Sequence, residues 1–177
     1  MKRIAFLSTT LVSALVLSAG ASGAVIKGTP GDDTLVGSPR ADRIVAGAGD
    51  DTLAGRGGND RILGEAGRDR IRGGAGRDWL TGGLGADALY GGRGNDVLRS
   101  RRGDDHVVGG PGRDRLWAGL GADVVHGGPG NDVLHAHAGD PATDTLDSGA
   151  GIDTPYARGN DRTIACETVI LVPASAG

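Results

Sequence analysis

The sequence predicts an all-β fold, a parallel β-roll (β-solenoid) of nonapeptide repeats with two stacked sheets of short strands and a C-terminal cap. One nine-residue pattern occurs twelve times in unbroken register from Gly28 to His135. The eighth place of the pattern is aliphatic in every copy, and the fourth place is Gly in eleven of the twelve. Nine residues are too few for a helical repeat, whose units are several times longer. Each unit is therefore expected to form a turn followed by a strand.

The length of the unit also predicts how successive units are arranged. Six turn-forming residues followed by about three strand residues, with only the middle one directed inward, match the alternation of a β-strand. One nonad then forms a turn and strand on one side, and the next nonad returns on the other, so that eighteen residues complete a coil. Twelve nonads give six coils at the ~4.8 Å spacing of neighbouring strands, or a stack about 29 Å tall.

Residues 1–24 precede the repeats and have the pattern of a secretory signal peptide. Lys2 and Arg3 are followed by an apolar run from Ile4 to Leu17 and then by small residues, which is the order of a cleavable export signal. We expect cleavage after Ala21 or Ala24, a secreted mature protein and no membrane span in the mature form. Cleavage removes two positive charges, so the formal net charge changes from -3 to -5.

Composition excludes an internal disulfide and argues against nucleic-acid binding. A single Cys, Cys166, excludes an internal disulfide. Aromatic residues make up only 3% of the chain and Gly accounts for 35 residues, a composition that would indicate disorder if it lacked a period. Arg residues are interspersed with Asp instead of forming a block, whereas nucleic-acid binding is associated with a patch of one sign. No nucleic-acid partner is expected.

The sixth place of the repeat predicts a calcium site. It is Asp in every copy, and the chain has 20 Asp against 2 Glu. In an eighteen-residue coil these Asp residues form two columns, one on each edge of the roll, and stacked carboxylates repel each other unless a cation lies between them. Ca²⁺ combines carboxylate and carbonyl oxygens, and an Asx turn cap is the alternative role for the same Asp. The candidate metal ligands are Asp33, Asp51, Asp69, Asp87, Asp105 and Asp123 on one edge and Asp42, Asp60, Asp78, Asp96, Asp114 and Asp132 on the other.

The core of such a roll is too thin to stabilise it without a ligand. Each coil buries two aliphatic side chains, worth about 1.5–3 kcal/mol each, while fixing the backbone costs about 1–2 kcal/mol for every residue. Bound ions are therefore expected to supply folding free energy, with ten ions as the upper limit for twelve nonads. Weaker binding is expected where Arg40 replaces the fourth-place Gly and where Ser100 begins its nonad, near Asp42 and Asp105.

The outward-pointing ninth places of the repeat and the C-terminal segment also allow predictions. Arg99, Trp117 and His135 follow one another at eighteen-residue steps, so they are expected either to stack for rigidity or to form a ligand platform. Residues 25–135 are assigned to the roll and residues 136–177 to irregular repeats and a cap. Pro155, at a strand centre, is expected to mark a sheet edge because Pro cannot donate to a ladder.

The repeats at 91–99 (GGRGNDVLR) and 127–135 (GGPGNDVLH) resemble the calcium-binding nonapeptides of the repeats-in-toxin, or haemolysin-type, family. The resemblance implies that the twelve Asp residues, with turn carbonyls, hold Ca²⁺ between turns two repeats apart, and that the roll orders outside the cell. It also implies that a Cys near the end pairs with an earlier Cys, but the corresponding earlier position holds Ser148.

The predicted function is that of a secreted calcium-binding structural protein whose folding is coupled to Ca²⁺. The alternative is an extracellular adhesive or surface-array module that contacts a cell-surface glycan or other rolls through its outward side chains. A hydrolase is the least favoured reading, because no Ser or Cys occurs in a recognisable arrangement with a base and an orienting group. We therefore predict no enzymatic activity.

Overall fold

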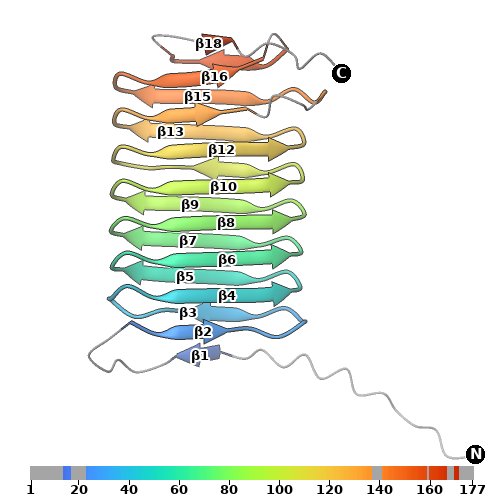
Figure 1. Ribbon diagram of the computed structural model, residues 1–177, viewed down its shortest axis with the longest axis vertical. Helices are drawn as coiled ribbons and strands as arrows, with labels where there is room; N and C mark the ends of the chain where they lie inside the picture. The colour runs from blue at the N-terminus through green and yellow to red at the C-terminus, as the bar shows by residue number, and fades with distance from the viewer. Residues whose placement is uncertain (1–13, 17–22, 137–140, 159, 167–169, 172–177) are drawn as a thin grey trace, which may run out of the picture.

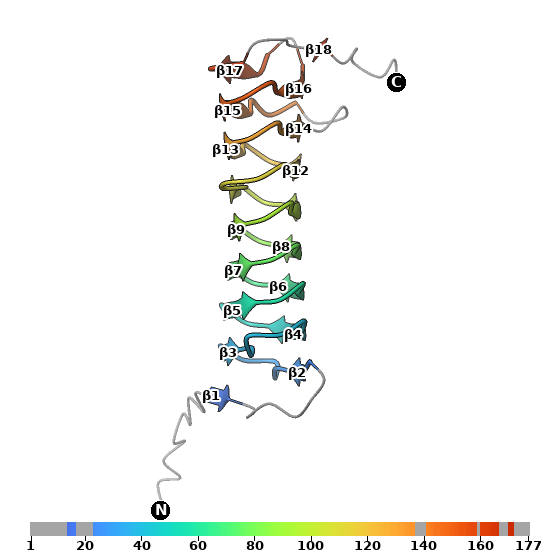
Figure 2. The same cartoon turned by 90° about the vertical axis from the view of Figure 1, so that its left-hand side faces the viewer.

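The computed structural model describes residues 14–16, 23–136, 141–158, 160–166 and 170–171 and shows a tall, narrow stack of coils (Figure 1). Two nine-stranded parallel sheets face each other, and consecutive strands alternate between them (Figure 2). The predicted all-β roll with two parallel sheets is confirmed. No helix long enough to cross a membrane occurs in the described ranges.

The odd-numbered strands form one sheet, here called the odd sheet. They are β1 (Ala14–Val16), β3 (Thr34–Val36), β5 (Thr52–Gly57), β7 (Arg70–Ala75), β9 (Ala88–Arg93), β11 (His106–Val108), β13 (Val124–Pro129), β15 (Thr145–Ala150) and β17 (Arg162–Ile164). The even-numbered strands form the even sheet. They are β2 (Val25–Lys27), β4 (Arg43–Ala48), β6 (Arg61–Ala66), β8 (Trp79–Leu84), β10 (Val97–Arg102), β12 (Arg115–Leu120), β14 (Val133–His135), β16 (Thr154–Ala157) and β18 (Ile170–Leu171).

The coil length follows from the register of these strands. Leu98 pairs with Leu80 in one neighbouring strand and with Leu116 in the other, so each coil contains eighteen residues as predicted. The eighth-place side chains of all twelve nonads form the core and are at most 1 % exposed. Burial of this column aligns the coils, because a slip by one residue would turn every core side chain outward.

Most strands are longer than the sequence predicted. Ten of them continue from the seventh place of one nonad into the first places of the next, as β9 does from Ala88 to Arg93, instead of ending after three residues. The first place of the next nonad therefore also points inward: Gly91 is buried beside the core. The sequence predicted only one inward residue in each strand, so this second inward column is a difference from the prediction.

Two edges join the sheets. Turns that lead into the odd strands contain Asp33 and its counterparts, and this side is called the Asp33 edge. Turns that lead into the even strands contain Asp42 and its counterparts, and this side, on the left in Figure 1 and facing the viewer in Figure 2, is called the Asp42 edge.

The segment after His135 continues both sheets. β15 pairs with β13, and β16 pairs with β14. The expectation that Pro155 lies at a sheet edge is wrong, because β16 also pairs with β18. That outer ladder begins at Tyr156, one residue after the proline. Since Thr154 donates to the inner neighbour, at the carbonyl of Asp132, the nitrogen of Pro155 faces the outer side before the ladder to β18 begins.

Much of the predicted signal peptide lies outside the described residues. Within residues 1–24, the structure describes Ala14–Val16, which pair with Thr34–Val36, and residues 23 and 24.

Candidate metal centre

The twelve Asp residues predicted as metal ligands all lie in the turns and are at most 4 % exposed. In each column, a carboxylate accepts a hydrogen bond at Oδ1 from the backbone N–H of the Asp one coil earlier. The Asp78 N–H donates to Asp96 Oδ1 at 2.8 Å, and the Asp96 N–H donates to Asp114 Oδ1 at 2.7 Å. The predicted division into two columns is therefore present as two ladders of hydrogen bonds along the edges.

The second oxygen of most of these carboxylates is buried without a hydrogen-bond donor. Buried polar atoms in native proteins nearly always have a partner, and an exception calls for an explanation such as a bound ion. Among the described residues, the atoms in this condition include Oδ2 of Asp51, Asp60, Asp69, Asp78, Asp87, Asp96, Asp105, Asp114, Asp132 and Asp153.

A small space lined by oxygen atoms lies beside this Oδ2 wherever the nonad begins with Gly. A Cβ placed on Gly91, the first residue of its nonad, would lie 2.6 Å from Asp96 Oδ2 and 2.6 Å from the carbonyl oxygen of Gly109 in the next coil. On Gly109 the corresponding distances are 2.5 Å to Asp114 Oδ2 and 2.7 Å to the Gly127 oxygen. First-place glycine thus leaves room where a carboxylate and a carbonyl from adjacent coils converge.

The second and fourth places direct further carbonyl oxygens along the stack. Gly92 and Gly94 have φ angles of 111° and 139°, which glycine adopts readily and other residues rarely do. A Cβ on either would collide with the carbonyl oxygen of its counterpart one coil earlier, Gly74 or Gly76. Carbonyl oxygens of successive turns therefore lie close to the backbone of the next coil, between stacked turns.

The donor set fits Ca²⁺. In the described residues, no three His, Cys, Asp or Glu side chains form a cluster that would hold a metal by themselves. A site in the turns must therefore combine each carboxylate with backbone carbonyls. Ca²⁺ accepts such all-oxygen sets of six to eight ligands, whereas transition metals favour His or Cys.

Burial of the ladders changes the acidity of the carboxyl groups. Loss of hydration raises their pKa, the hydrogen bond from the preceding Asp N–H lowers it, and neighbouring carboxylates raise the pKa of several of them further. The pKa reaches about 7 for Asp60, Asp87 and Asp114 and about 6 for Asp69, Asp96, Asp105 and Asp132. Without a cation, the charged form of these groups is costly at neutral pH.

The first turn of each edge differs from the turns above it. Asp33 Oδ2 accepts the Thr29 N–H at 2.6 Å, and Asp42 Oδ2 accepts the Ser38 N–H at 2.5 Å. Both carboxylates therefore cap their own turns, as in the Asx alternative. Asp105 keeps a buried Oδ2 without a donor, but it differs from the other interior aspartates because a hydrogen bond with the Ser100 side chain lowers the pKa of its carboxyl group.

The two edges differ at the first place. All six nonads of the Asp42 edge begin with Gly, whereas three of the six on the Asp33 edge begin with Ala46, Ser100 and Ala118. A side chain at this place enters the oxygen-lined space. The Asp42 edge is therefore the more open of the two.

Two aspartates beyond the twelve continue the ladders. Asp144 Oδ1 accepts the N–H of Asp123, and Asp153 Oδ1 accepts that of Asp132, each across 21 residues instead of eighteen. Three inserted residues break the register before them, so a strict period of nine misses both. The turn sequence from Ser148 to Asp153 is the signal that identifies the second of them.

The RTX calcium-binding nonapeptide repeat model matches four times, at residues 27–62, 63–98, 100–134 and 130–155. The chain belongs to this family. Its RTX repeats bind Ca²⁺, and the stacked Asp ladders of the roll are consistent with that. The RTX matches extend past His135 and include Asp144 and Asp153. Comparison with curated proteins gave no match.

The outward ladder around Trp117 is a closed stack in this RTX roll. His135 lies between Trp117 and Tyr156, with ring centroids 5.1 Å and 4.5 Å away and planes within 7° of parallel. The Arg99 guanidinium lies 4.8 Å from the Trp117 centroid on the other side. Both faces of Trp117 are therefore covered, which favours stacking for rigidity over a platform for sugar rings.

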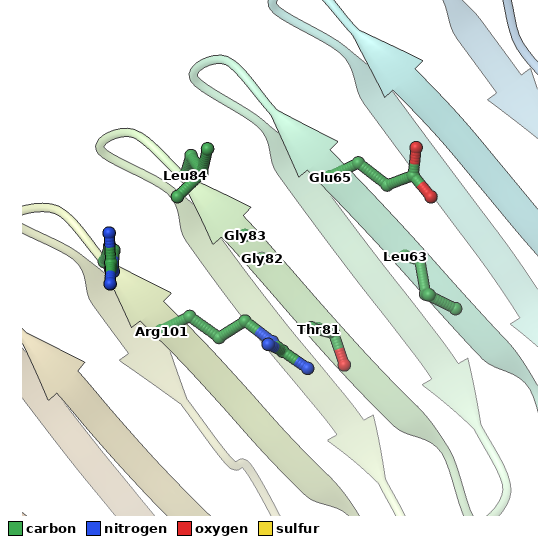
Figure 3. Close-up of a pocket in the computed structure, with 8 residues that line it drawn as sticks. Leu63, Glu65, Thr81, Gly82, Gly83, Leu84 and Arg101 are labelled. Atoms are coloured by element: carbon green, nitrogen blue, oxygen red, sulfur yellow. The ribbon is translucent and has the colours of Figure 1, made fainter.

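A cleft of about 310 Å³ lies on the even sheet (Figure 3). Glu65 and Arg101 flank Gly83, which pairs with both of them. Each occupies a second place usually held by Gly, with φ of 84° and 91°. The cleft lining contains one carboxylate and one hydroxyl, Glu65 and Thr81, and this pair lacks the orienting group that an activated nucleophile needs.

Proposed function

We propose that this RTX protein is a secreted, calcium-binding structural protein in which Ca²⁺ held between stacked turns drives folding of the roll. The observation that carries the proposal is the series of buried Oδ2 atoms that have no hydrogen-bond donor. Where the nonad begins with Gly, this Oδ2 lies beside a carbonyl oxygen of the adjacent coil, in a space that the glycine leaves open. The residues proposed as ligands are the turn aspartates together with turn carbonyls.

The coupling to folding follows from the raised pKa values. At neutral pH, a metal-free roll must either bury charged carboxylates or protonate them, and both cost free energy. A cation removes that cost, so its binding free energy becomes folding free energy. Extracellular modules bind Ca²⁺ at about 10⁻⁴–10⁻³ M. In this proposal the signal peptide exports a weakly folded chain, which orders on meeting calcium outside the cell.

The proposal also ranks the sites. Ten ions remain the upper limit for the twelve nonads, and the tighter sites are assigned to the interior of the Asp42 edge, where every first place is Gly. The lowest turns are expected to bind most weakly, because the N–H groups of Thr29 and Ser38 already bond the Oδ2 atoms of Asp33 and Asp42. The proposal gives the roll no catalytic role.

The decisive experiment replaces Asp96 by Asn. Asn keeps an Oδ1 acceptor for the Asp78 N–H but has no negative charge. If calcium is the purpose of the column, Asp96→Asn lowers the number of bound ions and raises the calcium concentration needed for folding, measured by elemental analysis and circular dichroism. Asp33→Asn is the matched control and is expected to change both quantities less. Equal ion counts and folding midpoints for Asp96→Asn and the parent protein would show that the Asp column only caps turns.

A further inference from the structure

The fold separates charges that the sequence interleaves. Fourteen Asp residues lie buried in the turns, which leaves at most eight of the 22 acidic residues (22 less 14) for the surface. The chain has 19 basic residues, and none of those described is buried. The outer surface is therefore much more basic than the formal net charge of -3 indicates.

On one edge of this surface, none of the described residues is an exposed acid. The described acidic residues outside the buried turn columns lie elsewhere. At the fifth place of the Asp33 edge, Asp32, Asp50 and Asp104 accept backbone N–H groups from the next coil. Glu65 lies in β6 on the even sheet, Asp147 pairs with His126 on the odd sheet, and Asp161 joins the ladder above Asp144.

On the Asp42 edge, the fifth place alternates between Asn and Arg. Asn59 Oδ1 accepts the Arg77 N–H at 2.8 Å, and Asn95 Oδ1 accepts the Arg113 N–H at 2.9 Å. These bonds hold the backbone of each arginine in place. They also turn the amide oxygen of each Asn toward the next coil. The exposed fifth-place column from 59 to 113 therefore presents guanidinium and amide groups and no carboxylate.

A cavity of about 240 Å³ lies within this column, lined by Arg77, Asn95, Arg113 and Arg115 above the buried Asp96 and Asp114. Among the described residues, none of Arg77, Arg113 and Arg115 forms an ion pair within 4 Å. Arg77 and Arg113 are two coils apart, or ~9.6 Å at the usual strand spacing. The site thus offers two guanidinium groups two coils apart on one edge, with that of Arg115 in the same coil as Arg113.

We propose that the Asp42 edge binds a linear acidic polysaccharide through Arg77, Arg113 and Arg115, with a carboxylate on alternate sugars facing the arginines of alternate coils. Arginine is suited to this role because its planar group binds carboxylates in a bidentate manner. Single-stranded nucleic acid is disfavoured, since its binding depends on free aromatic faces. The nearby Trp79 has Arg61 and Arg99 over its ring, at 5.8 Å and 5.1 Å, from strands on either side.

The inference rests on the proposed function in one respect. Calcium in the turns beneath the arginines would fold the edge and neutralise Asp96 and Asp114, which increases its attraction for a polyanion. Calcium binding and polymer binding are measured separately, so that failure of one is distinguishable from failure of the other.

The test uses the whole protein in millimolar calcium and hyaluronan oligosaccharides as the probe, with affinity measured by calorimetry at two salt concentrations. The double variant Arg77→Gln/Arg113→Gln is expected to bind about tenfold more weakly, as expected for the loss of two exposed charge contacts, and to depend less on salt. The matched control, Arg68→Gln/Arg102→Gln, removes the same charge from the Asp33 edge and is expected to bind within twofold of the parent protein.

Three results would overturn the proposal: equal loss in both double variants, equal binding of neutral dextran, or tighter binding of single-stranded DNA than of hyaluronan. Circular dichroism and ion counts on the same samples establish that each variant is folded and loaded. Arg115→Gln provides a second variant if the double variant unfolds. Calcium binding without hyaluronan binding refutes this inference alone, whereas hyaluronan binding by a roll that folds without calcium refutes the proposed function alone.

Discussion

Gly91→Ala tests the oxygen-lined space directly. The backbone of Gly91 does not have a positive φ, so alanine is not excluded by conformation. The added Cβ would lie 2.6 Å from both Asp96 Oδ2 and the Gly109 oxygen, well inside contact distance, and it would displace any ion from that position. Overpacking of this kind typically costs about 1–3 kcal/mol, and we expect the loss of a bound ion in addition.

Gly57→Ala is the matched control on the same edge. At this third place, the nearest atom to an added Cβ is the Ala75 oxygen at 3.7 Å, which is ordinary contact, and other nonads have Ala48, Ala66 and Ala75 here. We expect Gly57→Ala to change stability by less than about 0.5 kcal/mol. The assay is a calcium titration followed by circular dichroism, with ion counts at saturation. The reasoning is refuted if Gly91→Ala titrates like the parent protein, or if the two alanine variants are equally damaged.

Three further perturbations have defined outcomes. In chelator, the roll is expected to be more folded at pH 4.5 than at pH 7.5. Carboxyl groups whose pKa is raised to about 6 or 7 favour the folded state when protonated, and this stabilisation is lost as pH rises from about 4 through about 7. An unchanged circular dichroism signal between the two pH values would contradict this expectation. Arg101→Gly is expected to stabilise the calcium-loaded protein by about 1 kcal/mol, because glycine relieves the backbone strain of a φ of 91° at this position. Thermal unfolding measures the gain, and Arg102→Gly, at an ordinary φ, is the control that is expected to give none. Ser148→Cys is expected to form a disulfide with Cys166 under oxidising conditions, since the Ser148 hydroxyl lies against the Cys166 thiol. Closing the loop between these residues is expected to stabilise the roll by about 3 kcal/mol. A thiol assay that still detects two free thiols would exclude the disulfide.

The nine-residue period was sufficient to predict the class of fold and the two Asp columns. A roll of eighteen-residue coils buries the apolar eighth-place side chain of every nonad. In that roll the sixth-place Asp residues lie on the two edges. Properties that depend on three-dimensional contacts were less accessible. The inward first place was not recognised because glycine has no side chain to give it an apolar or polar pattern. Asp144 was missed because three inserted residues moved it out of register.

The arginines show a different limit of sequence reasoning. Along the chain, Arg77 and Arg113 are each followed directly by an Asp, which suggested a mixed surface. The turn geometry places the Asp inside and the preceding Arg outside, so neighbours in sequence lie in different environments. A basic edge cannot be recognised until the direction of each side chain is known.

The hydrogen-bonded Asp ladders give the stack a direction. In every rung, the N–H comes from the coil nearer the N-terminus and the accepting carboxylate from the coil nearer the C-terminus. A coil added at the C-terminal end therefore meets a donor that is already fixed, whereas a coil added at the N-terminal end must supply one. Deleting the first coil removes the donor of a buried carboxylate, while deleting the last coil frees only an N–H at the end of the stack. The two ends of the roll are therefore chemically different: the C-terminal end offers a backbone N–H and the N-terminal end a buried carboxylate.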